Sequence, residues 1–189
     1  MEFDVKKIHD PKFFKENCMA AHSDHVTYKN EAEAMEQNSS FRLSLDGIWK
    51  FHYAKNDAQT IPGFEAEDYN CRPGFETPEY DCTKWDDIRV PAHIQMEGYD
   101  IPQYANIQYP WDGREDVWRD AVPTDFNPVA SYVKYFTLPE GFVKNGLYIS
   151  FQGVESGFAL WLNGSYVGYS EDSFTPSEFD LTPYVKEGD

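Results

Sequence analysis

The chain has 189 residues, 41% of them hydrophobic and 17% aromatic, which suits one domain with a full core. Acidic residues outnumber basic ones by 33 to 16, and the formal net charge of −17 argues against nucleic acid and anionic membranes as partners. With three irregularly spaced cysteines, no apolar leader and no membrane-length apolar run, we expect a cytoplasmic protein.

Residues 1–42 are expected to form an irregular N-terminal arm with short helices. DPKFFKEN predicts a turn of helix that begins at its proline, and NEAEAMEQN, residues 30–38, predicts a helix capped by Asn30. Between them, His22 and His25 flank an aspartate. These three side chains could form a metal or acid–base cluster, but we favour a polar arm that lies on another surface.

Strand patterns begin at SLDGIWKFHYA, which places Trp49, Phe51 and Tyr53 on one face of a strand. WDDIRVP predicts a short strand that stops at its proline. Each of these strands is followed by a long connection, and connections of such length are usually functional or packed against something else.

From Ser131 onward the strand patterns become dense. SYVKYFTLP and GLYISFQGV predict two strands, and SGFALWLNGSYVGYS predicts a hairpin that turns at Asn163 and Gly164. TPSEFDLTPYV adds one more strand or turn, in which Ser177 is expected to act as a cap. Strands of this length without long intervening helices predict an all-β, antiparallel sandwich over residues 43–189, truncated before its last strand.

One connection contains an unusual stretch, YANIQYPWDG, in which Tyr104, Tyr109 and Trp111 lie among residues that break regular structure. Proline lacks an N–H group and fixes φ, so this stretch is a poor central strand. Its aromatic rings either anchor a long surface loop or face a ligand.

Several blocks of the sequence resemble the N-terminal part of β-galactosidases of glycoside hydrolase family 2, and the resemblance extends over nearly the whole chain. It implies a jelly-roll, galactose-binding-like β-sandwich, which is the family's sugar-binding domain. It also implies a parent enzyme that hydrolyses terminal β-D-galactosyl residues with retention, in a TIM barrel that this chain lacks. We therefore expect no catalytic residue here and no activity of the chain alone. The blocks are RLSLDGIWKFHYA, IRVPAHIQMEGYDIPQYANIQYPWDG, NPVASYVKYFTLP, FQGVESGFALWLNGSYVGYSEDSFTPSEFDLT and, in the arm, ENCMAAHSDHVTY.

The resemblance implies that Asn106 reaches the barrel mouth and contacts the galactosyl unit. An amide suits this role because it offers two donors and one acceptor to neighbouring hydroxyls. Ile107 would line the same site, while Tyr104 and Trp111 would either stack on the sugar or anchor the loop.

The resemblance also bears on metal ions. Asp10 and Glu171 fall near family positions that help to bind a peripheral Mg²⁺, but Lys7 lies near the family's first acidic ligand and departs from the pattern. We expect no cofactor in the chain itself, and Mg²⁺ and Na⁺ in the complete enzyme.

Adjacent acidic pairs at 86–87, 115–116 and 171–172 could suggest a catalytic dyad. Neighbouring residues on a strand point to opposite faces, so we expect these pairs to be structural or solvated instead.

Three functions remain open at this point: part of a β-galactosidase, a stand-alone galactoside-binding module, or a purely architectural domain. Partners implied by the resemblance are a β-galactoside, the remaining domains of the enzyme and further copies in a homo-oligomer. β-Glucuronidases and β-mannosidases share the jelly-roll plan, but YANIQYP and DSFTPSEFDL favour a galactosidase.

Overall fold

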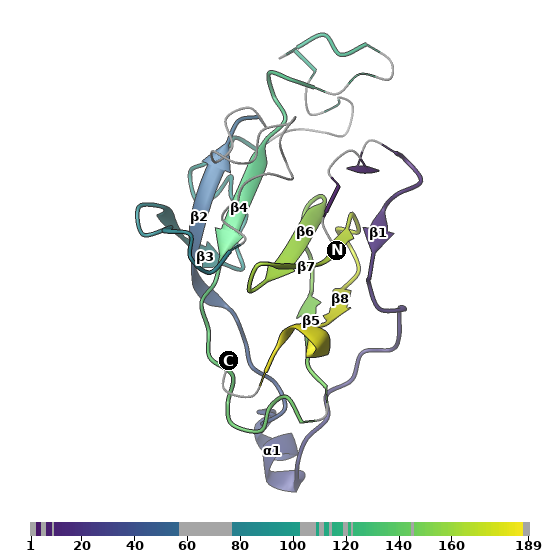
Figure 1. Ribbon diagram of the computed structural model, residues 1–189, viewed down its shortest axis with the longest axis vertical. Helices are drawn as coiled ribbons and strands as arrows, with labels where there is room; N and C mark the ends of the chain where they lie inside the picture. Colours follow the sequence, from purple (N-terminus) through teal and green to yellow (C-terminus); the bar gives the residue numbers. More distant parts are fainter. Residues whose placement is uncertain are drawn as a thin grey trace. The chain divides into compact units, whose positions relative to one another are not determined.

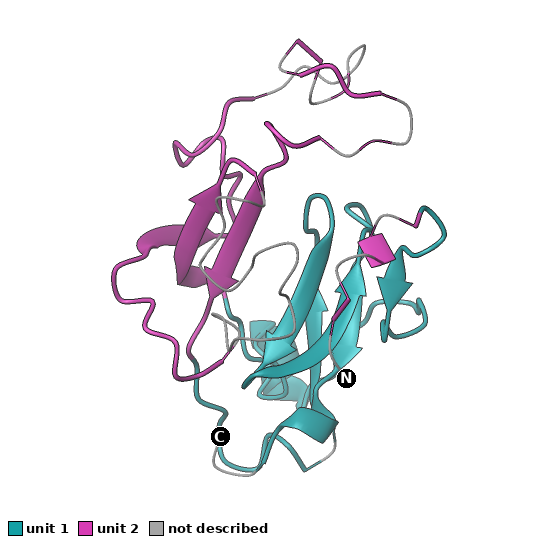
Figure 2. Ribbon diagram, turned by 45° about the horizontal axis from the view of Figure 1, so that its top comes forward, with its two compact units in different colours: residues 1, 11–45, 136–189 teal, residues 2–10, 46–135 magenta. Residues whose placement is uncertain are grey.

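The computed structural model describes residues 3–4, 7–8, 10–56, 77–102, 109, 112–113, 115–118, 121, 123–144 and 146–186. The chain divides into two compact units, shown in different colours in Figure 2 and described separately here. Unit 1 contains Pro11–Leu45 and Phe136–Asp189, and unit 2 contains Glu2–Asp10 and Asp46–Tyr135. The predicted boundary between an arm and a domain at residue 43 stays a prediction. Within the described ranges, none of the helices has the length and apolar character that a membrane span requires.

Unit 1 is built from two small antiparallel sheets (Figure 1). One sheet has the order β1-β7-β6, and the other pairs β5 with β8. A 3-10 helix, η3 (Thr182–Tyr184), follows the last strand. The strands are β1 (Lys15–Glu16), β5 (Tyr148–Phe151), β6 (Phe158–Leu162), β7 (Ser165–Ser170) and β8 (Ser177–Asp180).

The hairpin of β6 and β7 turns where the sequence predicted. Asn163 has a φ of 50° and Gly164 a φ of 79°. Two successive residues with positive φ match the twist of a two-residue hairpin, and asparagine followed by glycine tolerates them best. The predicted hairpin is therefore confirmed.

The core of unit 1 lies between its two sheets. Val167 of β7 and Phe179 of β8 are buried in one cluster, together with Leu147 and Leu181 beside the strands. The ring of Phe158 on β6 meets the Phe179 ring edge-on, with centroids 5.9 Å apart. Because both sheets contribute to one core, they pack as two layers, and the predicted all-β antiparallel fold is confirmed.

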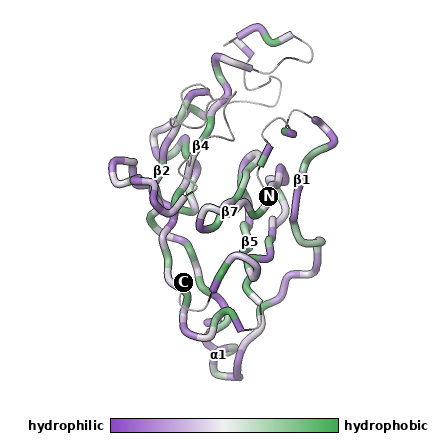
Figure 3. The backbone as a smooth tube through the Cα atoms, viewed as in Figure 1, coloured by the Kyte–Doolittle hydropathy of each residue, from purple (hydrophilic) through white to green (hydrophobic). Residues whose placement is uncertain are grey.

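Unit 2 contains one antiparallel sheet with the order β3-β2-β4. Its strands are β2 (Gly47–Ala54), β3 (Asp86–Val90) and β4 (Val129–Val133). All three were predicted, although β4 begins two residues before the expected Ser131. Figure 3 shows hydrophobic and hydrophilic segments interspersed along the chain.

The N-terminal arm differs from its prediction at one place. Lys15 and Glu16 form β1, paired with Ser170 and Tyr169 of β7, instead of belonging to a helical turn after Asp10. Backbone pairing with a neighbouring strand outweighs the weak local helix preference. By contrast, the second helix is confirmed as α1 (Glu31–Glu36), where the Asn30 side chain accepts a hydrogen bond from the Glu33 N–H at 3.0 Å.

Past β1, the arm follows β7 and β8. The Cys18 thiol lies 3.2 Å from the carbonyl oxygen of Tyr169, and the Met19 N–H donates to the carbonyl of Glu178 at 2.8 Å. His22 Nε2 lies 2.5 Å from Glu178 Oε2. Hydrogen bonds to the Ser23 carbonyl and to this carboxylate raise the pKa of His22. These contacts agree with a polar arm that lies on another surface.

Ser177 also differs from its expected role as a cap. It is the first residue of β8, it is buried, and its hydroxyl lies 2.8 Å from the hydroxyl of Ser170 on β7. Its role is structural, as expected, but it joins two strands instead of ending a turn.

Candidate functional site

The four predicted sugar-binding residues, Tyr104, Asn106, Ile107 and Trp111, lie outside the described residues. The nearest described residues on either side are Pro102, Tyr109 and Asp112, and they belong to unit 2. The candidate site is therefore built from the residues that fix the two ends of its loop.

Tyr99 fixes the N-terminal end of the loop. Its ring lies against Phe51 of β2, with centroids 4.5 Å apart, and near Tyr53, with centroids 6.3 Å apart. Burial, and then the neighbouring carboxylate of Asp86, raise the pKa of the Tyr99 phenol. The sequence predicted this aromatic face of β2. It holds the chain at Tyr99, four residues before residue 103, where the undescribed part of the loop begins.

A turn fixes the C-terminal end of the loop. The Tyr109 N–H donates to Asp112 Oδ2 at 2.9 Å, and the Asp112 N–H donates to the Tyr109 carbonyl at 3.0 Å. Gly113 has a φ of 77°, a conformation that favours glycine. The Tyr109 side chain is 67% exposed, so the turn presents this ring to solvent.

Glu115, which follows this turn, binds the backbone of residues 124–126 through its carboxylate. Its carboxylate accepts hydrogen bonds from the backbone N–H groups of Thr124, Asp125 and Phe126 at 3.1, 3.0 and 3.4 Å. These donors lower the pKa of Glu115, because they favour the charged form. Glu115 is therefore a structural clamp, as expected for this acidic pair, and not half of a catalytic dyad.

The Glu115 clamp gives a pH-dependent prediction. The pKa of Glu115 in the folded state lies below the ordinary value of 4.5. Its contribution to the stability of the fold is therefore complete above pH 4.5, and it is lost as the pH falls through the lowered pKa. The amide resonance of Thr124, whose N–H donates to this carboxylate and whose side chain has no carboxyl group, should therefore titrate with a midpoint below 4.5 in NMR spectra. Glu115→Gln should abolish this titration and the matched variant Asp116→Asn should keep it. A midpoint at or above the ordinary value would contradict the clamp.

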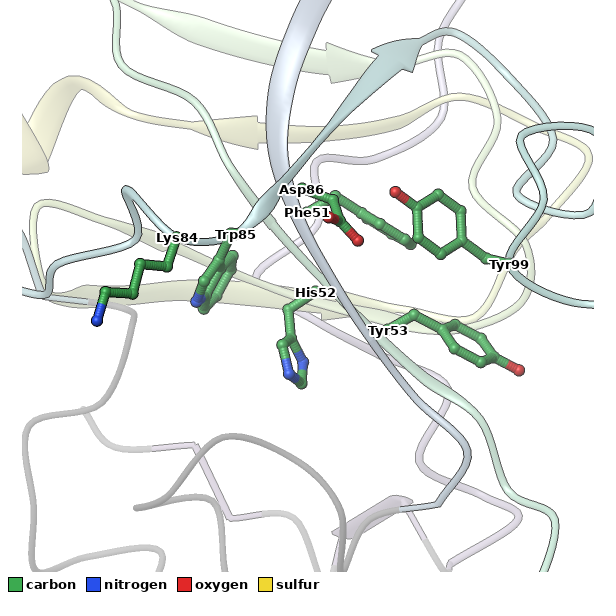
Figure 4. Close-up of a pocket in the computed structure, with 7 residues that line it drawn as sticks. All are labelled: Phe51, His52, Tyr53, Lys84, Trp85, Asp86 and Tyr99. Atoms are coloured by element: carbon green, nitrogen blue, oxygen red, sulfur yellow. The ribbon is translucent and has the colours of Figure 1, made fainter.

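The structure also shows a pocket that sequence reasoning missed. It has a volume of about 280 Å³ and is lined by Phe51, His52, Tyr53, Lys84, Trp85, Asp86 and Tyr99, all from unit 2 (Figure 4). The tryptophan of WDDIRVP was visible in the sequence as the first residue of a predicted strand, whereas β3 begins one residue later, at Asp86. What was not visible is that this tryptophan lies next to His52 of β2, with ring centroids 5.5 Å apart.

Comparison with known proteins assigns the chain to a family. The model of the family described as "Glycosyl hydrolases family 2, sugar binding domain" matches residues 42–189, well over half of the chain. The chain belongs to this family. The resemblance drawn from the sequence blocks is therefore confirmed.

Relatives of this sugar-binding domain are larger proteins. A beta-galactosidase of Halalkalibacterium halodurans is 51% identical over 98% of this chain, and one of Streptococcus thermophilus is 44% identical over 96%. The chain spans 17% of the length of each of these curated relatives. A solved beta-glycosidase from Bacteroides vulgatus aligns with a TM-score of 0.48 and 25% identity, covering 76% of this chain and 15% of that chain.

The two predicted metal ligands of the sugar-binding domain fall in different units, Asp10 in unit 2 and Glu171 in unit 1. The Glu171 carboxylate accepts a hydrogen bond from the Tyr169 hydroxyl at 2.7 Å. Among the described residues, no three histidine, cysteine, aspartate or glutamate side chains are grouped so as to hold a metal ion. The described residues thus offer no complete metal site, and the two ligands stay a prediction.

The remaining acidic pairs of the domain have structural roles. Asp87 of β3 forms an ion pair with Lys50 of β2, with Nζ and Oδ1 2.7 Å apart. Asp172 accepts hydrogen bonds from the N–H groups of Phe174 and Thr175, both at 3.0 Å, and from the Thr175 hydroxyl. These side chains hold a sheet and a turn in shape, as the sequence suggested.

Proposed function

We propose that this chain is the sugar-binding domain of a β-galactosidase and that the loop between Tyr99 and Asp112 contributes to the galactosyl site. The observation that carries the proposal is the family match over residues 42–189, joined to relatives named beta-galactosidase that are similar over almost the whole chain. The anchored ends of the loop support it further, since a binding residue works only when its backbone is held in place.

Within this loop, Asn106 is the proposed galactosyl ligand. Its amide would donate to one sugar hydroxyl and accept from another, which lets a single side chain read two neighbouring hydroxyls. Ile107 would line the same site, and Tyr104 and Trp111 would stack on the sugar or anchor the loop. A site built on hydrogen bonds rejects a sugar that lacks the matching hydroxyl.

We assign bond cleavage to the part of the enzyme outside this chain. Retaining hydrolysis needs two carboxyl groups about 5–5.5 Å apart, one as acid and base and one as nucleophile. We assign neither to this chain. The proposal extends to a cytoplasmic homo-oligomer with Mg²⁺ and Na⁺ in the complete enzyme. A stand-alone galactoside module is the competing function, and a single asparagine without a facing wall would make a poor binding site by itself.

Asn106→Ala tests the site within a chimera in which this chain replaces the matching segment of the Halalkalibacterium halodurans relative. We expect kcat/KM on a nitrophenyl β-galactoside to fall roughly 5- to 150-fold, since a lost buried hydrogen bond costs roughly 1–3 kcal/mol. The matched control is Asn38→Ala, an exposed asparagine just after α1, which should leave kcat/KM unchanged. Equal kcat/KM values for the two variants would contradict the assignment of Asn106 as a galactosyl ligand.

A further inference from the structure

We propose that the pocket at the start of β3 is a second carbohydrate site, which binds one ring of a neutral saccharide. The inference goes beyond the proposed function and does not depend on it. Tyr99, which anchors the loop, also lines the pocket, but none of the four proposed galactosyl residues does.

The pocket forms where β2 continues past the beginning of β3. β3 starts at Asp86, which pairs with Phe51, whereas β2 runs on to Ala54. His52 and Tyr53 therefore reach beyond the end of their neighbouring strand. Figure 4 shows the resulting arrangement, with Trp85 on one side of the β2 residues and Tyr99 on the other.

The aromatic walls of the pocket are held in place by their neighbours. The ring of Trp85 lies between two others, with centroid distances of 5.5 Å to His52 and 5.7 Å to Tyr80. The backbone N–H of Trp85 also donates to the Cys82 carbonyl at 3.0 Å. On the opposite side, Tyr99 is fixed against Phe51. Walls that are ordered before binding reduce the entropy that a ligand must overcome.

The polar groups of the pocket define the class of ligand. Lys84 and Asp86 carry opposite charges, and His52 adds a ring that can donate or accept a hydrogen bond. One amine and one carboxylate together select neither a cation nor an anion, and the chain's net charge of −17 repels anions further. The matching ligand has an apolar face for the rings and a hydroxyl-rich edge for the polar groups, which describes a neutral pyranose.

The experiment uses the 189-residue chain with ¹⁵N-labelled indoles, and each of its five tryptophans contributes one indole N–H resonance. Methyl β-D-galactopyranoside is the probe, and the Trp85 signal is assigned from its loss in Trp85→Phe. We expect a saturable shift of the Trp85 indole with a dissociation constant on the order of 1 mM, as suits a shallow pocket. Trp85→Ala should weaken binding at least about tenfold, measured by ligand-detected NMR.

The matched control is Trp118→Ala, because Trp118 is 83% exposed and does not line the pocket. It should bind the sugar as the unchanged chain does. Asn106→Ala should also leave the Trp85 shift intact, which separates this inference from the proposed galactosyl loop. The inference would be overturned by a Trp85 resonance that does not shift saturably, by an equal shift with glycerol, or by a shift that disappears in Asn106→Ala. The first two readouts need only the unchanged chain and the conservative variant Trp85→Phe, which assigns the resonance, so a failure of Trp85→Ala to fold cannot obscure them.

Discussion

Phe51→Ala should lower the free energy of unfolding by about 3–5 kcal/mol, the usual cost of removing a buried phenylalanine ring. Phe51 is 0% exposed and makes edge-on contacts with Tyr132 of β4 and Tyr99, at centroid distances of 4.8 and 4.5 Å. Alanine would leave a cavity that these rings cannot fill without moving. Urea denaturation followed by circular dichroism measures the loss.

The matched control for this prediction is Phe174→Ala. Phe174 is 96% exposed, so truncating it should change the free energy of unfolding by less than about 0.5 kcal/mol. Similar losses for both variants would show that Phe51 does not belong to a packed core. Because the Tyr99 ring packs against Phe51, Phe51→Ala should also broaden the NMR signals of the loop that starts at Tyr99.

Gly168→Ala should destabilise the chain by about 1–3 kcal/mol, as expected for overpacking. A Cβ atom at this position of β7 would lie 2.5 Å from a ring carbon of Phe179 and 2.6 Å from the backbone carbonyl oxygen of Glu16. The second of these atoms belongs to the backbone of β1, so relief requires the strand itself to shift. Thermal or urea denaturation compares the variant with the unchanged chain.

Gly153→Ala is the control for Gly168→Ala. At residue 153 the nearest atom to a new Cβ is the Ser173 carbonyl oxygen at 3.5 Å, an ordinary contact. Its stability should stay close to that of the unchanged chain. If Gly168→Ala left the midpoint of thermal or urea denaturation unchanged, β1, β7 and β8 would not be packed as closely as described.

Local pattern predicted most of the regular structure. The alternation in GIWKFHYA and the Asn163-Gly164 turn have short-range causes, and so does the Asn30 cap, which is why each was recognised. β1 has only two residues and exists because β7 provides a partner, so no local pattern could predict it. Ser177 resembled a cap because its neighbours in sequence are turn residues, whereas its partner, Ser170, lies on another strand.

The candidate site was less accessible to local reasoning. Asn106 follows from resemblance to a family, since nothing in its spacing distinguishes a sugar ligand from an ordinary loop asparagine. The pocket needs residues from β2, from the start of β3 and from Tyr99, which meet only after folding. The exception is the aromatic face of β2, where Phe51 and Tyr53 were predicted to lie together and now form the support of Tyr99.

The central claim is that this chain can serve as the sugar-binding domain of a β-galactosidase. The most direct test is the β-galactosidase activity of the chimera with the Halalkalibacterium halodurans relative, compared with that enzyme carrying its own segment. We predict a kcat/KM within about tenfold of the parent, which corresponds to about 1.4 kcal/mol of transition-state stabilisation. A chimera that folds and assembles like the parent enzyme but does not hydrolyse the galactoside would contradict the account.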